Sequence, residues 1–152
     1  MCIRDRINAS YLVRACEGTD LRKEFFDDHF PMILINNSPV DFISSVYGCS
    51  VTVNKNSGQT CWYLPLTPRL AIQFINKQDW EKIFKKVTHG EINEDQVKCV
   101  EHFNDQMADY VDLKVNDAID DSHDIYYLFS NNEDELKRIK NRIKAERKTK
   151  GA

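Results

Sequence analysis

The feature that most constrains the fold is a row of apolar residues at three- and four-residue steps within residues 97 to 111. The row consists of Val97, Val100, Phe103, Met107, Tyr110 and Val111. This spacing places them on one face of an α-helix. It predicts a long helix from about residue 93, with Asn93 as its N-cap and two acidic residues in the first turn, where the helix dipole favours negative charge. Continued spacing at Val115 and Ile119 predicts that the helix runs on.

The segments before this helix have the pattern of β-strands. The sequence MILINNSPV, residues 32 to 40, is an apolar strand that stops at Asn36 and runs into a turn. Asn and Ser side chains bond their own backbone in such turns, and Pro39 fixes φ. Alternating β-branched and aromatic residues surround an Asn/Ser/Gly loop and predict a β-hairpin over about residues 49 to 64. Residues 69 to 75 predict a further strand.

Proline and polar residues mark the remaining boundaries. Pro65 and Pro68 lack a backbone N–H, so a sheet edge or a break in pairing is expected there. Residues 79 to 87 are helix-like, with an end expected near His89 and Gly90, and residues 124 to 130 form a short β-like run. Asn131 or Asn132 is expected to cap a last helix with acidic residues in its first turn. Its apolar stripe is narrow, so we expect it to pack lightly and fray after residue 144.

These elements predict an α+β fold, with a small antiparallel sheet packed by two or three helices. A chain of 152 residues fits one domain. Residues 1 to 6, MCIRDR, resemble a translated sequencing adapter. We therefore expect them to be a non-native scar, and residues 7 to 152 to be the C-terminal part of a larger domain.

Hydropathy and cysteine content bear on the cellular compartment of the protein. No apolar run approaches the roughly 20 residues of a membrane helix, and no apolar region of a secretory signal follows the first residues. The cysteines are odd in number and contain no C-x-x-C pair; they are Cys2, Cys16, Cys49, Cys61 and Cys99. Free thiols in the cytoplasm are therefore expected, without zinc or another cofactor.

Charge is strongly segregated along the chain. Residues 91 to 124 contain eleven Asp or Glu and two Lys, whereas residues 137 to 152 contain eight Lys or Arg and one Glu. The basic tail makes Lys137, Arg138, Arg142 and Lys144 candidates for nucleic-acid contacts, since phosphates need clustered cations. The alternative is that the helix dipole and the acidic helix neutralise these cations. No aromatic residue is interleaved to stack on bases.

Candidates for catalysis are few. His29 follows Asp27 and Asp28, and a carboxylate–histidine pair can transfer protons or hold a metal, although neighbouring residues point in different directions. The alternative is a turn before a strand. Cys49 and Cys61 are either reactive thiols or small buried apolar residues. The sequence contains no G-x-S-x-G, P-loop or G-x-G-x-x-G motif.

Two proline-containing motifs occur in order and carry a resemblance. The first comprises Asn36, Asn37, Ser38, Pro39 and Val40, and the second comprises Pro65, Leu66, Thr67, Pro68, Arg69 and Leu70. With Phe103-Asn104 and the run IYYLFS, this set resembles the C-terminal half of the bacterial family called domain of unknown function 4238, over roughly residues 25 to 140. That family opens with a His-His-Tyr-Val-Pro segment, which is not present here, and its turn has Asp where this chain has Asn37.

Three functions stay open from the sequence. The first is a portion of an intracellular bacterial protein that has no catalytic constellation of its own. The second, for which the basic tail and the missing histidine-rich segment are the grounds, is the C-terminal half of a nucleic-acid-processing enzyme, nuclease-like and with a role in phage defence, whose histidine-rich segment lies upstream. The third is a protein-interaction module that uses the acidic helix or the basic tail.

Overall fold

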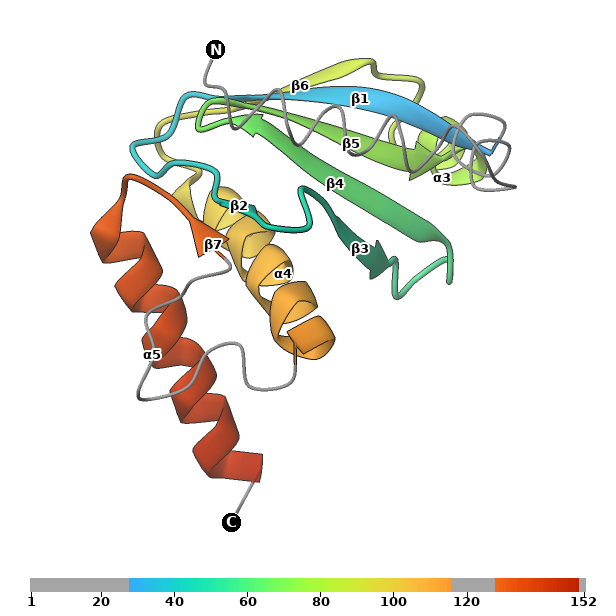
Figure 1. The fold of residues 1–152 in the computed structure, drawn as a ribbon. Coiled ribbons are helices and arrows are strands. Elements are labelled where there is room, and N and C mark those ends of the chain that lie inside the picture. Colours follow the sequence, from blue (N-terminus) through green and yellow to red (C-terminus); the bar gives the residue numbers. More distant parts are fainter. Residues whose placement is uncertain (1–27, 116–127, 151–152) are drawn as a thin grey trace.

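The computed structural model describes residues 28 to 115 and 128 to 150, and its element order confirms the α+β class. In chain order the elements are β1 (His29–Asn36), β2 (Ser44–Ser45), β3 (Ser50–Val53), β4 (Thr60–Thr67), β5 (Leu70–Asn76), α3 (Lys77–Lys82), β6 (His89–Ile92), α4 (Val97–Val115), β7 (Leu128–Phe129) and α5 (Glu133–Lys150). Figure 1 shows the main sheet above α4, with α5 beyond α4. Within the described ranges, no helix has the length and apolar character needed to cross a membrane.

The main sheet has the strand order β3-β4-β5-β1-β6. Strands β3 and β4 form the predicted hairpin, and β5 is the strand predicted over residues 69 to 75. All pairs are antiparallel except β1 and β6, which run parallel. The prediction of an antiparallel sheet is therefore incomplete, because β6 returns to the far side of β1. Strands β2 and β7 form a separate antiparallel pair.

Pro65 lies where the pairing of β4 changes. Strand β3 pairs with β4 only as far as Tyr63, so Pro65 lies beyond the end of β3. A register irregularity follows between Pro65 and Thr67 on the β5 side. The missing N–H of Pro65 therefore breaks no bond to β3, and the expected interruption of pairing is confirmed.

Two helix boundaries differ from the prediction. Helix α3 ends at Lys82, and Lys85 and Lys86 have positive φ values of 49° and 64°, which turn the chain out of the helix. The expected helix end at His89 and Gly90 is therefore wrong, because both residues lie in β6. Helix α4 begins at Val97, so the prediction that Asn93 is its N-cap is also wrong. A local turn precedes α4, in which the N–H of residue 96 donates to the carbonyl of residue 93.

Helix α5 is capped as predicted but is longer than expected. The side chain of Asn132 accepts from the backbone N–H of Glu135 at 3.1 Å, which confirms the cap. The helix continues to Lys150, so fraying after residue 144 is wrong. An ion pair between Arg147 and Asp112 at 2.6 Å lies beyond that point and ties the last turns to α4. The expected continuation of the long helix to Ile119, and residues 124 to 127 of the expected strand, lie outside the described residues.

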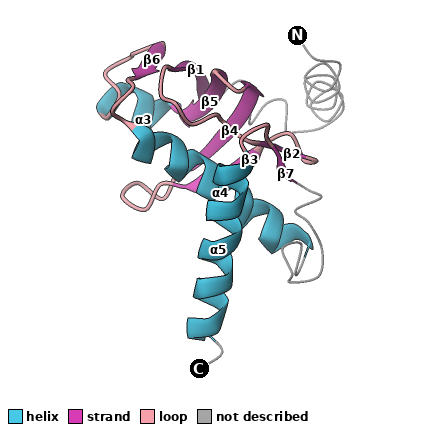
Figure 2. Ribbon diagram, turned by 90° about the vertical axis from the view of Figure 1, so that its left-hand side faces the viewer, coloured by secondary structure: helices cyan, strands magenta, loops and turns pink. Residues whose placement is uncertain are grey.

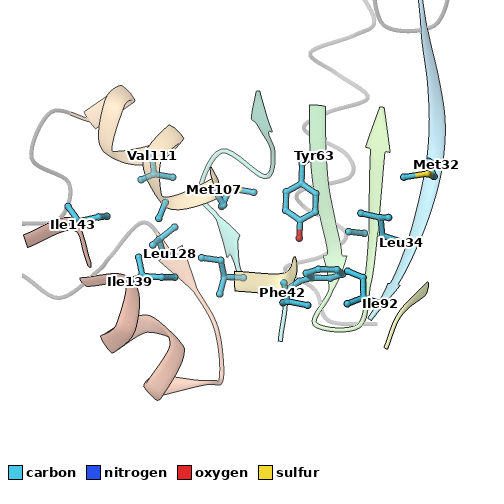
Figure 3. Packing of buried hydrophobic residues seen from close by; sticks show 14 of the residues in the cluster. Met32, Leu34, Phe42, Tyr63, Ile92, Met107, Val111, Leu128, Ile139 and Ile143 are labelled. Carbon is cyan, nitrogen blue, oxygen red and sulfur yellow. The ribbon is translucent and has the colours of Figure 1, made fainter. Parts of the chain in front are cut away.

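One core joins the inner face of the sheet to both long helices. The labelled side chains in Figure 3 come from β1, the segment before β2, β4, β6, α4, β7 and α5. The ring of Phe103 on α4 stacks on Tyr63 of β4 with centroids 4.8 Å apart. Ile139 and Ile143 bring α5 into the same core. This packing fixes the positions of the polar residues described next.

Candidate functional site

The turn after β1 is built around the side chain of Asn36. Asn36 is buried, and its Nδ2 donates to the carbonyls of Val40 at 2.8 Å and Pro68 at 3.2 Å. Its Oδ1 accepts from the N–H of Ser38 at 3.0 Å, and the Ser38 hydroxyl donates to the Val40 carbonyl at 3.1 Å. The predicted turn chemistry is confirmed. Every hydrogen-bonding group of the Asn36 amide except one Oδ1 lone pair is thereby engaged with backbone.

The structure brings the two sequence motifs together. The Pro68 carbonyl accepts from both Asn36 Nδ2 and the backbone N–H of Phe42, the latter at 3.0 Å. The backbone N–H of Asn36 donates to the Arg69 carbonyl at 2.9 Å, and an Arg69 Nη1–H donates to the Ser38 carbonyl. The second motif ends in a local turn, where Thr67 Oγ1 accepts from the Arg69 N–H at 3.2 Å. Segments about 30 residues apart therefore form one hydrogen-bonded unit.

An open hollow of about 720 Å³ lies beside this unit. Its lining residues are Ile35, Asn36, Asn37, Ser38, Pro39, Arg69 and Glu94. Asn37 and Glu94 are exposed, and the Arg69 side chain is half-exposed with its Nη2 3.0 Å from an oxygen of Asp41. The hollow therefore presents an amide, a guanidinium and a carboxylate to solvent. Sequence reasoning missed Glu94, which reaches this place because the N–H of Asn37 donates to the carbonyl at the end of β6.

A second buried amide joins α4 to two other parts of the chain. Asn104 is fully buried, and its Oδ1 accepts from the N–H of Ile43 at 3.0 Å. Its Nδ2 donates to the Asp41 carbonyl and to Glu135 Oε1, both at 2.9 Å. Asn104 thus links α4, the segment before β2 and the first turn of α5. Asn104 was noticed in the sequence only as part of the resemblance.

Glu135 is a buried carboxylate that completes this link. Arg138 donates to both of its carboxylate oxygens, through Nε and Nη2 and both at 2.8 Å, in a bidentate arrangement. Burial raises the pKa of Glu135, but the hydrogen bonds from Arg138 and Asn104 and the Arg138 charge outweigh burial, so the pKa lies below its ordinary value. The hydrogen bond to Glu135 is the main reason that the pKa of Arg138 is raised.

The four predicted nucleic-acid contacts separate into two groups. Arg138 and Arg142 face α4, and both bind Asp105, at 2.8 and 3.0 Å. Lys137 is exposed and makes no ion pair with an acidic residue of α4 within the described residues, and Lys144 is half-buried. The neutralisation of the tail by the acidic helix, the alternative left open from the sequence, therefore occurs for the arginines.

The remaining candidates for catalysis, His29 and the cysteines, lie in surroundings that do not favour a reactive group. His29 is buried at the start of β1, with Nε2 3.2 Å from the carbonyl and from the hydroxyl of Thr60. Burial is the main reason that the pKa of the Cys61 thiol is raised to about 11, with the Asp79 charge adding to it against a hydrogen bond from Gln73. Such a thiol is a poor nucleophile near neutral pH. Cys49, Cys61 and Cys99 are free, and residues 28 to 115 and 128 to 150 contain no cluster of three or more metal-ligating side chains.

Comparison with known proteins gives no match among the family models, the curated proteins or the solved structures. The resemblance to domain of unknown function 4238 therefore stays a prediction. The roles that it implies for residues 36 to 39 and 65 to 68 stay predictions too.

The arrangement has two chemical capacities. The buried amides and hydroxyl of Asn36, Asn104 and Ser38 hold backbone segments together through hydrogen bonds. The exposed groups of the hollow can form hydrogen bonds and ion pairs with a polar molecule from solvent. Both capacities are those of a scaffold with a binding surface.

Proposed function

We propose that the described residues form a scaffold within a bacterial cytoplasmic protein, and that their motif side chains hold the chain together instead of reacting with a substrate. The observation that carries this proposal is the Asn36 amide, which bonds to the backbone of both proline-containing motifs. An amide with these bonds has neither the charge nor a spare donor for acid–base work.

The second amide supports the same proposal. Asn104 makes three hydrogen bonds to two other parts of the chain while fully buried. Buried polar groups that are fully paired specify a single arrangement of the segments they join. The free thiols at Cys49, Cys61 and Cys99 suit the reducing cytoplasm, where disulfides are rare.

A turnover assay tests the proposal. The purified protein is incubated with duplex DNA, single-stranded RNA, p-nitrophenyl phosphate and p-nitrophenyl acetate, with and without Mg²⁺, Mn²⁺ or Zn²⁺. A double variant, Asn37→Ala with Glu94→Gln, removes exposed polar groups of the hollow, and Lys82→Gln on α3 is the matched surface control. We expect no turnover by any of the three proteins.

Two results would overturn the scaffold role. Turnover shared by the wild type and Lys82→Gln but lost in the double variant would make the hollow an active site. Turnover that persists equally in all three proteins through a second purification step would place a reacting group elsewhere in the chain.

The nucleic-acid-processing enzyme is the second candidate, and the exposed lysines of α5 favour it. Its test is binding and cleavage of DNA or RNA at low salt by the protein, and failure of both would reject it. An interaction module that uses the acidic face of α4 has less support, because α5 already occupies Glu101, Asp105, Asp109 and Asp112.

A further inference from the structure

Helix α5 sorts its positive charges by residue type. Its arginines turn toward α4, where Arg138, Arg142 and Arg147 pair with acidic residues at 2.6 to 3.6 Å. Lys137, Lys140, Lys144 and Lys148 recur at steps of three and four residues, which places them along one side of the helix. Arginine suits the ion pairs with α4 because its planar guanidinium can donate several hydrogen bonds at once to carboxylates. Three of the lysines, Lys137, Lys140 and Lys148, make no ion pair with α4 within the described residues.

Three lysines form a row that we call the lysine face: Lys137, Lys140 and Lys148. Steps of three and eight residues keep them within one side of an α-helix, over about 16 Å of its length. Lys137 and Lys148 are exposed and Lys140 is half-buried. None of the three pairs with an acidic residue in the described part of the chain.

Within the described residues, the surroundings of the lysine face leave its charge uncompensated. Between Lys137 and Lys148, α5 has one acidic residue, Glu146, and that residue pairs with Arg142 at 2.8 Å. Figure 2 shows α5 extending away from the sheet beyond α4, with its C-terminal end clear of the strands. A straight row of cations is thus accessible from solvent even though the whole chain has a net charge of −3.

The neighbouring residues decide which polyanion fits. An interfacial helix that enters a lipid surface needs a free apolar face opposite its basic face. The large apolar residues of α5 belong to the core: Ile139 and Ile143 are buried in it, and Leu136 packs against it. The other residues on this side of the helix are Asn141, Lys144 and Ala145, so it offers charge without a large apolar surface. Charge without an apolar surface or stacking groups matches the phosphate backbone of a nucleic acid.

We propose that the lysine face of α5 binds the phosphate backbone of duplex nucleic acid without regard to sequence. Lys137, Lys140 and Lys148 are the contacts, and Arg138 and Arg142 act as structural partners of α4. Lysine is a point charge that neutralises phosphate, and phosphate contacts carry no sequence information. This inference goes beyond the scaffold role, because it assigns a ligand to a surface that the scaffold leaves open.

The test compares two triple variants of equal charge. The variant Lys137→Gln, Lys140→Gln, Lys148→Gln removes the lysine face, and Lys55→Gln, Lys82→Gln, Lys98→Gln removes three exposed lysines elsewhere. Binding to a fluorescein-labelled 20-base-pair duplex is followed by anisotropy from 20 to 200 mM salt, after circular dichroism has shown that both variants fold.

The proposal predicts a specific pattern of affinities. The wild type should bind with a slope of log K against log salt near about −3, as expected for about three phosphate contacts. The lysine-face variant should bind about tenfold more weakly or worse with a flatter slope, and the control should match the wild type within about twofold. Duplexes of different sequence should bind alike.

Three results would overturn the proposal. The first is no binding by the wild type at 20 mM salt. The second is equal weakening of both triple variants, which would assign the effect to net charge alone. The third is lysine-face-dependent binding to vesicles with anionic lipid, or to an acidic polypeptide such as polyglutamate, without binding to the duplex.

Discussion

Replacing Asn104 with alanine is expected to destabilise the fold more than any exposed substitution on α4. The change removes three hydrogen bonds and leaves the Ile43 N–H and one Glu135 carboxylate oxygen in a buried place with fewer partners. Leaving one buried partner unsatisfied costs about 1 to 3 kcal/mol. For the whole link we expect a loss of about 4 kcal/mol in the free energy of unfolding. That is a large part of the 5 to 15 kcal/mol that is usual for a domain.

The assay is urea unfolding followed by fluorescence of the native tryptophans. His102→Ala is the matched control, because His102 is exposed on the same helix and bonds only to Gln106 in the described contacts. We expect it to change the free energy of unfolding by less than about 0.5 kcal/mol. A loss below about 1 kcal/mol for Asn104→Ala would refute the reasoning, because it would mean that water or relaxation replaces the whole link.

Asn104→Asp sharpens the same test. It keeps an oxygen to accept from the Ile43 N–H but replaces the donor with a second oxygen, facing the Asp41 carbonyl and the Glu135 carboxylate. The pKa of such an aspartate would be raised, so its neutral form restores a donor as the pH falls. The stability deficit against the wild type should therefore shrink from pH 8 to pH 5. A deficit that is constant across this range would contradict the account.

Three further predictions follow from single side chains. Tyr63→Phe should raise the free energy of unfolding by about 1 kcal/mol, because within the described residues the buried hydroxyl has no hydrogen-bond partner; urea unfolding checks this, and a loss of similar size would contradict it. The pKa of Glu135 is lower when the chain is folded than when it is unfolded, so the ionised carboxylate stabilises the fold above about pH 4.5, and this stabilisation is lost as the pH falls through the lowered pKa. Glu135→Gln should therefore make the free energy of unfolding fall less steeply at acid pH than it does in the wild type. An unchanged acid limb of the stability-against-pH curve would show that Glu135 does not stabilise the fold in this way. At pH 8 iodoacetamide should modify exposed Cys99 well before Cys61, because the pKa of Cys61 is about 11; mass spectrometry of tryptic peptides measures both rates, and equal rates would show that the Cys61 thiol is accessible and ionised.

The sequence predicts most strands because their signals are local. The run that ends at Asn36 and the hairpin around an Asn/Ser/Gly loop have the required pattern within a few residues of each other. Strand β6 is missed because His89–Ile92 is short, contains glycine and gains its strand character from parallel pairing with β1, more than 50 residues earlier. The residues of such a strand do not by themselves show which strand it will pair with.

In the candidate site, too, local features could be predicted from the sequence and long-range contacts could not. The Asn36 turn is predictable because Asn and Ser bond backbone two residues away. Its bond to the Pro68 carbonyl depends on the pairing of β1 with β5. The separation of arginines from lysines on α5 depends on how α5 lies against α4, which composition cannot supply. Charge segregation in the sequence therefore predicts a basic helix, but it does not show which of its cations pair with acidic residues of α4 and which face solvent.

The scaffold role requires that the motif side chains join segments of the chain. Its most direct measurement is the free energy of unfolding of Asn36→Ala beside that of Asn37→Ala, from urea titrations under identical conditions. Asn36 makes three hydrogen bonds in a buried place, whereas its neighbour Asn37 is exposed. The account predicts a loss of about 3 kcal/mol for Asn36→Ala and less than about 0.5 kcal/mol for Asn37→Ala. Equal small losses for both variants would contradict it.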